Sequence, residues 1–135
     1  MVEMELEYLG NLNVKAKHGP SGTEITTAAP VDNHGDGSSF SPSDLMTTSL
    51  GACILTILGI QCEKKGISLE GVSARVEKHM QADPRRIGRI FIAFQFTQEY
   101  DANTRSKIQQ LAFCCPVCES INPDIELDFE FHFPG

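Results

Sequence analysis

The residues best suited to chemistry in this 135-residue sequence are its five cysteines, Cys53, Cys62, Cys114, Cys115 and Cys118. An odd number of thiols cannot all pair within one chain, so a disulfide-stapled secreted scaffold is excluded unless one cysteine pairs between chains. The spacing and surroundings of each thiol decide whether it is a core side chain, a redox group or a metal ligand.

Cys53 lies among small residues, in the run Ser49-Leu50-Gly51-Ala52-Cys53, within an uncharged segment at residues 45–62. Most free cysteines in apolar helices are buried core side chains, and the local context favours this interpretation. The small neighbours would also let another backbone or a substrate approach the thiol. That second interpretation makes Cys53 a candidate reactive group.

The run Cys115-Pro116-Val117-Cys118 has the C-x-x-C spacing of two known kinds of site. A thioredoxin-like motif is expected near a βαβ unit, which we do not expect in this chain. A structural zinc site needs four ligands, and the four histidines are scattered without a ligand-pair spacing. If Pro116 begins a short helix, Cys115 is its N-cap, where backbone amides and the helix dipole favour a thiolate.

Charge and composition exclude some partners. The sequence has 18 acidic and 11 basic side chains, a net charge of −7, whereas a nucleic-acid binder needs a basic face. No basic and apolar leader is present at the start, so we expect no signal peptide and a cytoplasmic protein. Residues 45–62 contain threonine, serine, glycine and glutamine, which favours a helix buried in protein over a membrane span.

Hydrophobic patterning predicts the elements that position these thiols. Alternation of apolar and polar residues predicts a meander of antiparallel strands at residues 3–8, 12–17 and 23–28. The run Ser41-Pro42-Ser43-Asp44 predicts a helix start, with Ser41 as N-cap and Asp44 near the positive end of the dipole. This helix should run to about Lys65 and stop at Gly66.

The second half of the chain predicts two strands at residues 72–80 and 89–96, a helix from about Asp101, and a last strand at residues 125–133. Because strands and helices do not alternate as βαβ units, we expect one α+β domain, residues 1–135, with antiparallel sheets. The long helix is apolar on nearly all sides, and a single short chain has difficulty covering it. We therefore expect an intertwined homodimer with sheets packed around this buried central helix.

Three segments together resemble the OsmC/Ohr family of thiol-dependent hydroperoxide reductases. They are Ser41-Pro42-Ser43-Asp44-Leu45, Ser49-Leu50-Gly51-Ala52-Cys53 and Cys115-Pro116-Val117. The order of strands and helices agrees over nearly the whole chain. The resemblance implies an intertwined homodimer with a site at the subunit interface, holding one cysteine of the central helix and one of the Cys-Pro turn.

By this resemblance Cys53 is the catalytic thiolate, which attacks an organic hydroperoxide, becomes a sulfenic acid and releases an alcohol. Cys115 is the resolving thiol, which condenses with the sulfenic acid to a disulfide that a cellular thiol or dithiol reduces. This chemistry needs no metal, flavin or haem. A pocket walled by strand aromatics and three helix residues, Leu50, Ile54 and Leu58, would favour apolar peroxides.

The sequence departs from the peroxidase branches of that family at the groups that activate the thiolate. Those branches have a glutamate after the proline of the helix start and an arginine from the N-terminal region. Here Ser43 follows the proline, Asp44 comes one residue later, and no arginine precedes Arg75, so we expect a weak peroxidase. Cys114 and Cys118 could compete as the resolving thiol, and Cys62 is expected to be structural.

Two other functions stay open at this level. The chain could be a dimeric OsmC-like protein that binds an apolar or thiol-reactive ligand without turnover. It could also be a redox- or zinc-sensing module built on its last three cysteines, Cys114, Cys115 and Cys118.

Overall fold

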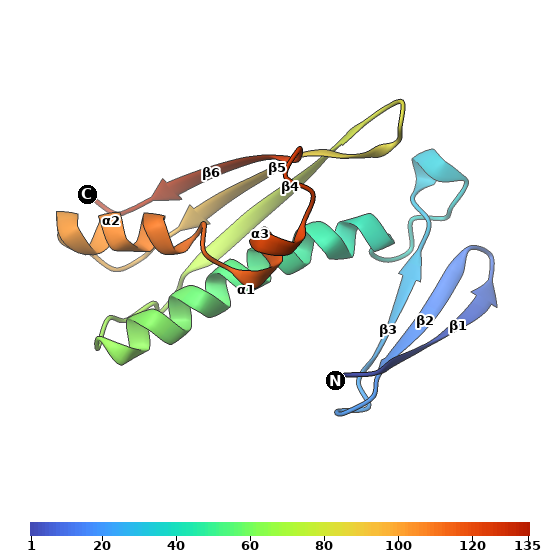
Figure 1. Ribbon diagram of the computed structural model, residues 1–135, viewed down its shortest axis with the longest axis horizontal. Helices are drawn as coiled ribbons and strands as arrows, with labels where there is room; N and C mark the ends of the chain where they lie inside the picture. The colour runs from blue at the N-terminus through green and yellow to red at the C-terminus, as the bar shows by residue number, and fades with distance from the viewer. The chain divides into compact units, whose positions relative to one another are not determined.

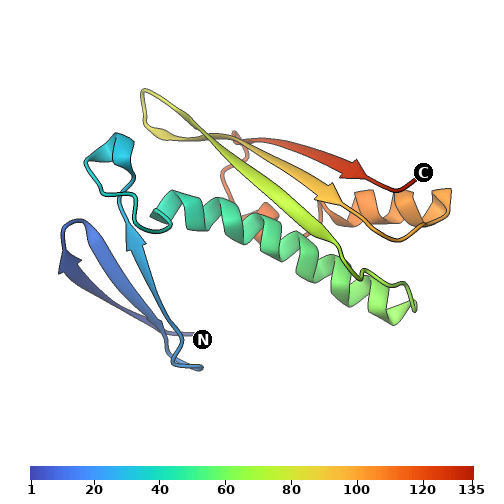
Figure 2. The ribbon, with the colours of Figure 1, turned by 180° about the vertical axis from the view of Figure 1, so that it is seen from behind.

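The structure, a computed structural model, describes every residue from Met1 to Gly135 and contains two three-stranded sheets with helices (Figures 1 and 2). The α+β class predicted from the order of strands and helices is confirmed. The chain divides into two compact units, Met1–Met46 and Thr47–Gly135.

The first unit is built on the predicted antiparallel meander. β1 (Met4–Gly10) pairs with β2 (Asn13–His18), and β2 pairs with β3 (Glu24–Ala28). A short 3-10 helix, η1 (Val31–Asn33), follows in the loop. Alternate side chains of β1 are apolar and exposed within this chain, namely Met4, Leu6 and Tyr8. This sheet therefore has an apolar face that the chain itself leaves open.

The long helix α1 (Pro42–Lys64) begins and ends where local sequence signals place it. The backbone N–H of Asp44 donates to Ser41 Oγ at 3.1 Å, and the Ser41 N–H donates to Asp44 Oδ2 at 2.9 Å. This reciprocal pair is a capping box, which satisfies two backbone donors that the helix cannot use itself. At the other end Gly66 has a φ of +69°, a left-handed conformation that glycine adopts at little cost.

Within this chain α1 buries one face. Its buried residues recur every three or four positions: Thr47, Leu50, Gly51, Ile54, Leu58 and Cys62. Ile60 is 45% exposed, so the expected burial of the helix on most sides is not reached by one chain. By length and hydropathy α1 could also cross a membrane, although the core helix of a soluble protein passes the same test. The second copy that would cover the open face stays a prediction.

The second sheet has the order β4-β5-β6. β4 (Ser73–Gln81) is antiparallel to β5 (Arg86–Gln95), and β6 (Glu126–His132) is parallel to β5. The prediction of antiparallel sheets is therefore wrong for β6, and so is the expected absence of a βαβ unit.

The physical reason is the connection between β5 and β6, which contains α2 (Ala102–Leu111) and α3 (Pro116–Ser120). Helices that run back along a sheet return the chain to the end where the previous strand began, so the next strand takes the same direction. The alternation of acidic and apolar residues in β6 correctly indicates one wet face, but a wet face does not fix strand direction.

The helices pack on one face of the β4-β5-β6 sheet (Figures 1 and 2), where the core of the second unit lies. Ile90, Ile92 and Phe94 of β5 are fully buried in this core. The Phe94 ring stacks on Phe131 of β6 with 5.2 Å between ring centres, which ties the parallel pair together beyond its backbone bonds.

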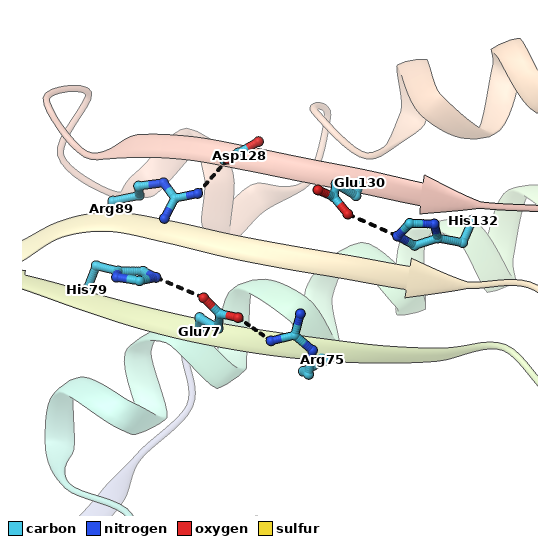
Figure 3. Close-up of polar contacts among 7 residues, drawn as sticks. All are labelled: Arg75, Glu77, His79, Arg89, Asp128, Glu130 and His132. Carbon is cyan, nitrogen blue, oxygen red and sulfur yellow. Dashed lines mark hydrogen bonds and ion pairs between the residues drawn. The ribbon is translucent and has the colours of Figure 1, made fainter.

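The opposite face of this sheet carries alternating charges (Figure 3). Arg89 donates to Asp128 Oδ2 at 2.6 Å, across the parallel pair. Phe91 is only 8% exposed because the guanidinium groups of Arg75 and Arg89 lie over its ring, 5.4 and 5.5 Å from the ring centre. β5 is thus buried on both faces, and arginine side chains cover the second face. The acidic residues of β6 lie on the solvated face.

Candidate thiol site

Cys115 occupies the N-cap of α3, as the proline after it predicted. Its backbone is extended, with φ −91° and ψ 150°, and Pro116 takes the first helical position. The Cys115 Sγ accepts a hydrogen bond from the backbone N–H of Cys118 at 3.3 Å. Cys115 has no exposed surface and belongs to the core of the second unit. Its sulfur is therefore positioned both by the core packing and by the Cys118 N–H.

Cys53 of α1 lies near Cys115, which is in the connection between β5 and β6. Cys53 is half-buried and packs against the same core, and it is near enough to Cys115 to raise the pKa of that thiol. The structure thus brings together two thiols that are far apart in the sequence.

Burial raises the pKa of the Cys115 thiol, and the neighbouring Cys53 and Cys118 thiols raise it further. The hydrogen bond from the Cys118 backbone N–H acts in the opposite direction and lowers the pKa. The backbone donor at the helix start does favour a Cys115 thiolate, as expected, but loss of solvent outweighs it. Burial also raises the pKa of the Cys118 thiol, with smaller contributions from Glu119, Cys114 and Cys53. Both groups hold their protons at neutral pH.

Comparison with known protein families identifies the family of this chain. Residues 35–130 match the family described as OsmC-like protein. The chain belongs to the OsmC-like family. No curated protein matches the sequence.

Solved structures share the OsmC-like fold over almost the whole chain. A candidate osmotic stress induced and detoxification response protein of Psychrobacter arcticus is 45% identical, with a TM-score of 0.94 over 98% of this chain and 96% of that one. The organic hydroperoxide resistance protein OsmC of Legionella pneumophila is 17% identical, with a TM-score of 0.75 and coverage of 98% and 96%. OhrB of Bacillus subtilis is 12% identical, with a TM-score of 0.69 and coverage of 97% of each chain. At the two lower identities the likeness shows the shared fold.

The other thiols of this OsmC-like chain differ in position. Cys118 is half-buried, it contributes to the raised pKa of Cys115, and Cys53 contributes to the raised pKa of Cys118. Cys114 is exposed, and its S–H donates to the Gln110 carbonyl at 3.5 Å. Cys62 is 3% exposed within the core, and burial raises its pKa. Sequence reasoning named all five thiols and Cys118 as a possible competitor of Cys115, and Cys118 lies near both Cys53 and Cys115.

Ser43 and Asp44, the expected supporting residues, lie in the first turn of α1 and in the first compact unit. Asp44 takes part in the capping box with Ser41, and Ser43 Oγ lies 3.3 Å from Ser41 Oγ. A carboxylate three residues after a serine is the sequence signature of such a box, so the reciprocal bonds could have been predicted.

Two further expectations concern the surroundings of the thiols. Leu50, Ile54 and Leu58 have no exposed surface and pack in the core, so they hold α1 on the sheet instead of walling an open pocket. No group of three or more His, Cys, Asp or Glu side chains is placed to hold a metal ion. The arrangement offers nothing in favour of a zinc-sensing function.

Proposed function

We propose that this OsmC-like protein is a thiol-dependent peroxidase that reduces organic hydroperoxides to alcohols. The observation that carries the proposal is that Cys53 and Cys115 pack in the same core, near enough for Cys53 to raise the pKa of the Cys115 thiol. Two relatives of the same fold are named organic hydroperoxide resistance proteins, which agrees with this chemistry. Cys53 would be the catalytic thiol and Cys115 the resolving thiol.

The difference in burial between the two thiols supports this division of roles. The thiolate is the form that attacks a peroxide. Cys115 is fully buried and its pKa is raised, so it keeps its proton, whereas Cys53 is partly open to an incoming substrate. The protonated Cys115 thiol can also donate a hydrogen bond to the Cys53 sulfur when that sulfur is negatively charged.

The reaction then runs in three balanced steps. The Cys53 thiolate attacks one peroxide oxygen, the O–O bond breaks, and the alkoxide takes a proton and leaves as an alcohol while Cys53 becomes a sulfenic acid. The Cys115 thiol attacks that sulfur, which forms a disulfide and releases water. A cellular thiol or dithiol returns both cysteines to the reduced state by exchange and is itself oxidised. No metal or organic cofactor takes part.

The proposed peroxidase is weak. Ser43 stands where the peroxidase branches have the glutamate of their activating pair, and no arginine precedes Arg75. Asp44, the next residue, is used in the helix cap. Thiolate attack by Cys53 would therefore lack the help of that activating pair.

The proposal includes a homodimer in which residues 1–135 act as one domain of each subunit. Met4, Leu6 and Tyr8 of β1 and Ile60 of α1 are large apolar side chains that a single chain leaves exposed. Apolar side chains exposed on each unit are typical of interfaces, and a second copy of the chain would cover them. We place the dimer in the cytoplasm, without nucleic-acid or membrane partners, because of its acidic charge and free thiols.

The test is a peroxide-consumption assay on the reduced full-length chain, with cumene hydroperoxide as substrate and dithiothreitol as reductant. We expect catalytic loss of peroxide above the rate with dithiothreitol alone, and slower loss with hydrogen peroxide. Light scattering coupled to size exclusion gives the oligomeric state of the same sample. Absence of turnover, with Cys53 still reduced by mass spectrometry, would refute the peroxidase. An apolar probe that then binds with defined stoichiometry would support a binding protein.

A further inference from the structure

We infer that Cys118 is the exit thiol of a three-cysteine relay, which takes over the disulfide from Cys53 and Cys115 and presents it to the reductant. This relay rests on the proposed peroxidase function and extends it to a thiol that the two-cysteine mechanism leaves unused. It concerns the step between formation of the first disulfide and its reduction.

The first support is the position of Cys118 relative to Cys115. The Cys118 backbone N–H donates to Cys115 Sγ at 3.3 Å, so the Cys115 sulfur lies over the helical turn that carries Cys118. Cys115 is the extended N-cap of α3 and Cys118 lies in the first turn after it. A disulfide needs Cβ atoms about 3.5–4.5 Å apart, so the bond between these two cysteines needs only a local adjustment of the turn that joins them. The backbone of α3 need not unfold for this bond to form.

The second support is the order of accessibility of the three sulfurs. Cys115 has no exposed surface, whereas Cys118 is partly exposed. A thiolate that reduces a disulfide must reach one of its two sulfurs directly. A disulfide moved to Cys118 therefore offers the reductant a second approach, away from the sulfur that binds peroxide.

The exchange step balances without any outside oxidant. The Cys118 thiol gives its proton to solvent and attacks Cys115 Sγ, a Cys115–Cys118 bond forms, the Cys53–Cys115 bond breaks, and Cys53 leaves as a thiolate. No electrons are gained or lost overall. Because Cys53 leaves in the form that attacks peroxide, the exchange prepares it for the next substrate before the reductant has acted.

Cys114 is the natural control because it lies next to Cys115 but is directed elsewhere. Its S–H donates to the carbonyl of Gln110 in α2 at 3.5 Å, and its side chain is exposed. A Cys114→Ser change removes a neighbouring thiol of the same segment while leaving the Cys115–Cys118 geometry in place.

Tryptic peptides make the relay directly visible. Cleavage after Lys17, Lys64 and Lys107 places Cys53 and Cys62 in residues 18–64, and the other three cysteines in residues 108–135. The first disulfide links these two peptides, whereas the relayed disulfide lies inside the second. Reduced full-length chain is treated with one equivalent of cumene hydroperoxide, quenched with N-ethylmaleimide, digested and analysed by mass spectrometry.

We expect the wild-type chain and Cys114→Ser to end with the internal disulfide and with Cys53 alkylated. Cys118→Ser should instead accumulate the linked peptides and turn over peroxide severalfold more slowly with dithiothreitol. Linked peptides as the stable product in wild type as well as in Cys118→Ser, with turnover intact in both, would overturn the relay and leave the peroxidase standing.

A second measurement separates the relay from the first step. Cys53→Ser treated with oxidised dithiothreitol should still form the internal disulfide in residues 108–135. Failure to form it would overturn the relay even if wild type consumes peroxide. Failure of wild type to consume peroxide at all would overturn both proposals.

Discussion

Gly51 of α1 packs so closely on Val76 of β4 that a Cβ at Gly51 would lie 3.0 Å from Val76 Cγ2. At Gly51 the helix thus lies close against the second sheet. The position comes two residues before Cys53, so the same close approach helps to set how deeply Cys53 sits against the core. A larger residue there would have to lift the helix or displace the valine.

Two glycines of α1 give a matched test of this contact. A Cβ at Gly59 meets nothing within 4 Å, so Gly59→Ala should stabilise the chain by about 1 kcal/mol through helix propensity alone. Gly51→Ala should gain less, and Gly51→Val should lose about 1–3 kcal/mol through overpacking. Urea unfolding of the reduced proteins measures all three. Equal effects of alanine at both sites would contradict the close contact, and a loss at Gly59 would indicate that a second copy packs there.

The capping box predicts a coupled pair. Ser41→Ala and Asp44→Ala should each lower the free energy of unfolding by about 1 kcal/mol, because each removes one of the two reciprocal bonds. The double variant should lose less free energy of unfolding than the sum of the two single losses. Once the first change has disrupted the capping box, the second has less stabilisation left to remove. Thr48→Ala, at an exposed position of the same helix, is the control. Strict additivity in the unfolding data would show that the two bonds do not act together.

The thiol assignments predict opposite outcomes for two cysteines of one helix. Cys53→Ser should abolish turnover of cumene hydroperoxide because it removes the thiol proposed to attack the peroxide. Cys62→Ala should keep turnover near wild type and cost about 1 kcal/mol of stability, since it only removes a buried core atom. Steady-state assays at matched protein concentration compare the two. Activity in Cys53→Ser would place the reactive sulfur elsewhere.

The raised thiol pKa values predict loss of stability in alkali. Burial raises the pKa of Cys62, Cys115 and Cys118 in the folded chain, so the unfolded chain loses these protons first. Their contribution is fully present below the unfolded thiol pKa of about 8.5 and is lost as the pH rises through the folded values. Urea midpoints of reduced protein should therefore fall between about pH 7.5 and about pH 10. The urea midpoint of Cys62→Ala should fall less over the same pH range. A fall as large as that of the wild type would contradict the burial argument for that thiol.

The features that the sequence predicts well are those set by a few neighbouring residues. Both ends of α1 follow from Ser41, Pro42 and Gly66, because capping is a contact between residues one turn apart. The N-cap position of Cys115 follows from Pro116 for the same reason. The strands of the first sheet follow from alternation between short turns.

What the sequence does not predict depends on the rest of the molecule. The parallel direction of β6 is decided by the helical crossover and not by the pattern of β6 itself. The protonated state of Cys115 is decided by the core around it, which local capping rules do not include. The proximity of Cys53 to Cys115 was implied by the family resemblance alone, because nothing in either local segment indicates the other.

The parallel pairing of β5 with β6 also bears on how the newly made chain survives oxidation. Phe94 pairs with Phe131 across the whole crossover, whereas β4 and β5 are joined by a short turn, so we expect β6 to dock after β4 and β5 have paired. Until it does, the segment with Cys115 has no anchored end and Cys53 lacks its proposed resolving partner. A sulfenic acid formed then would proceed to irreversible acids instead of a disulfide. We expect the nascent protein to be more easily inactivated by peroxide than the mature protein. Faster synthesis would therefore protect the chain by shortening the time before β6 docks.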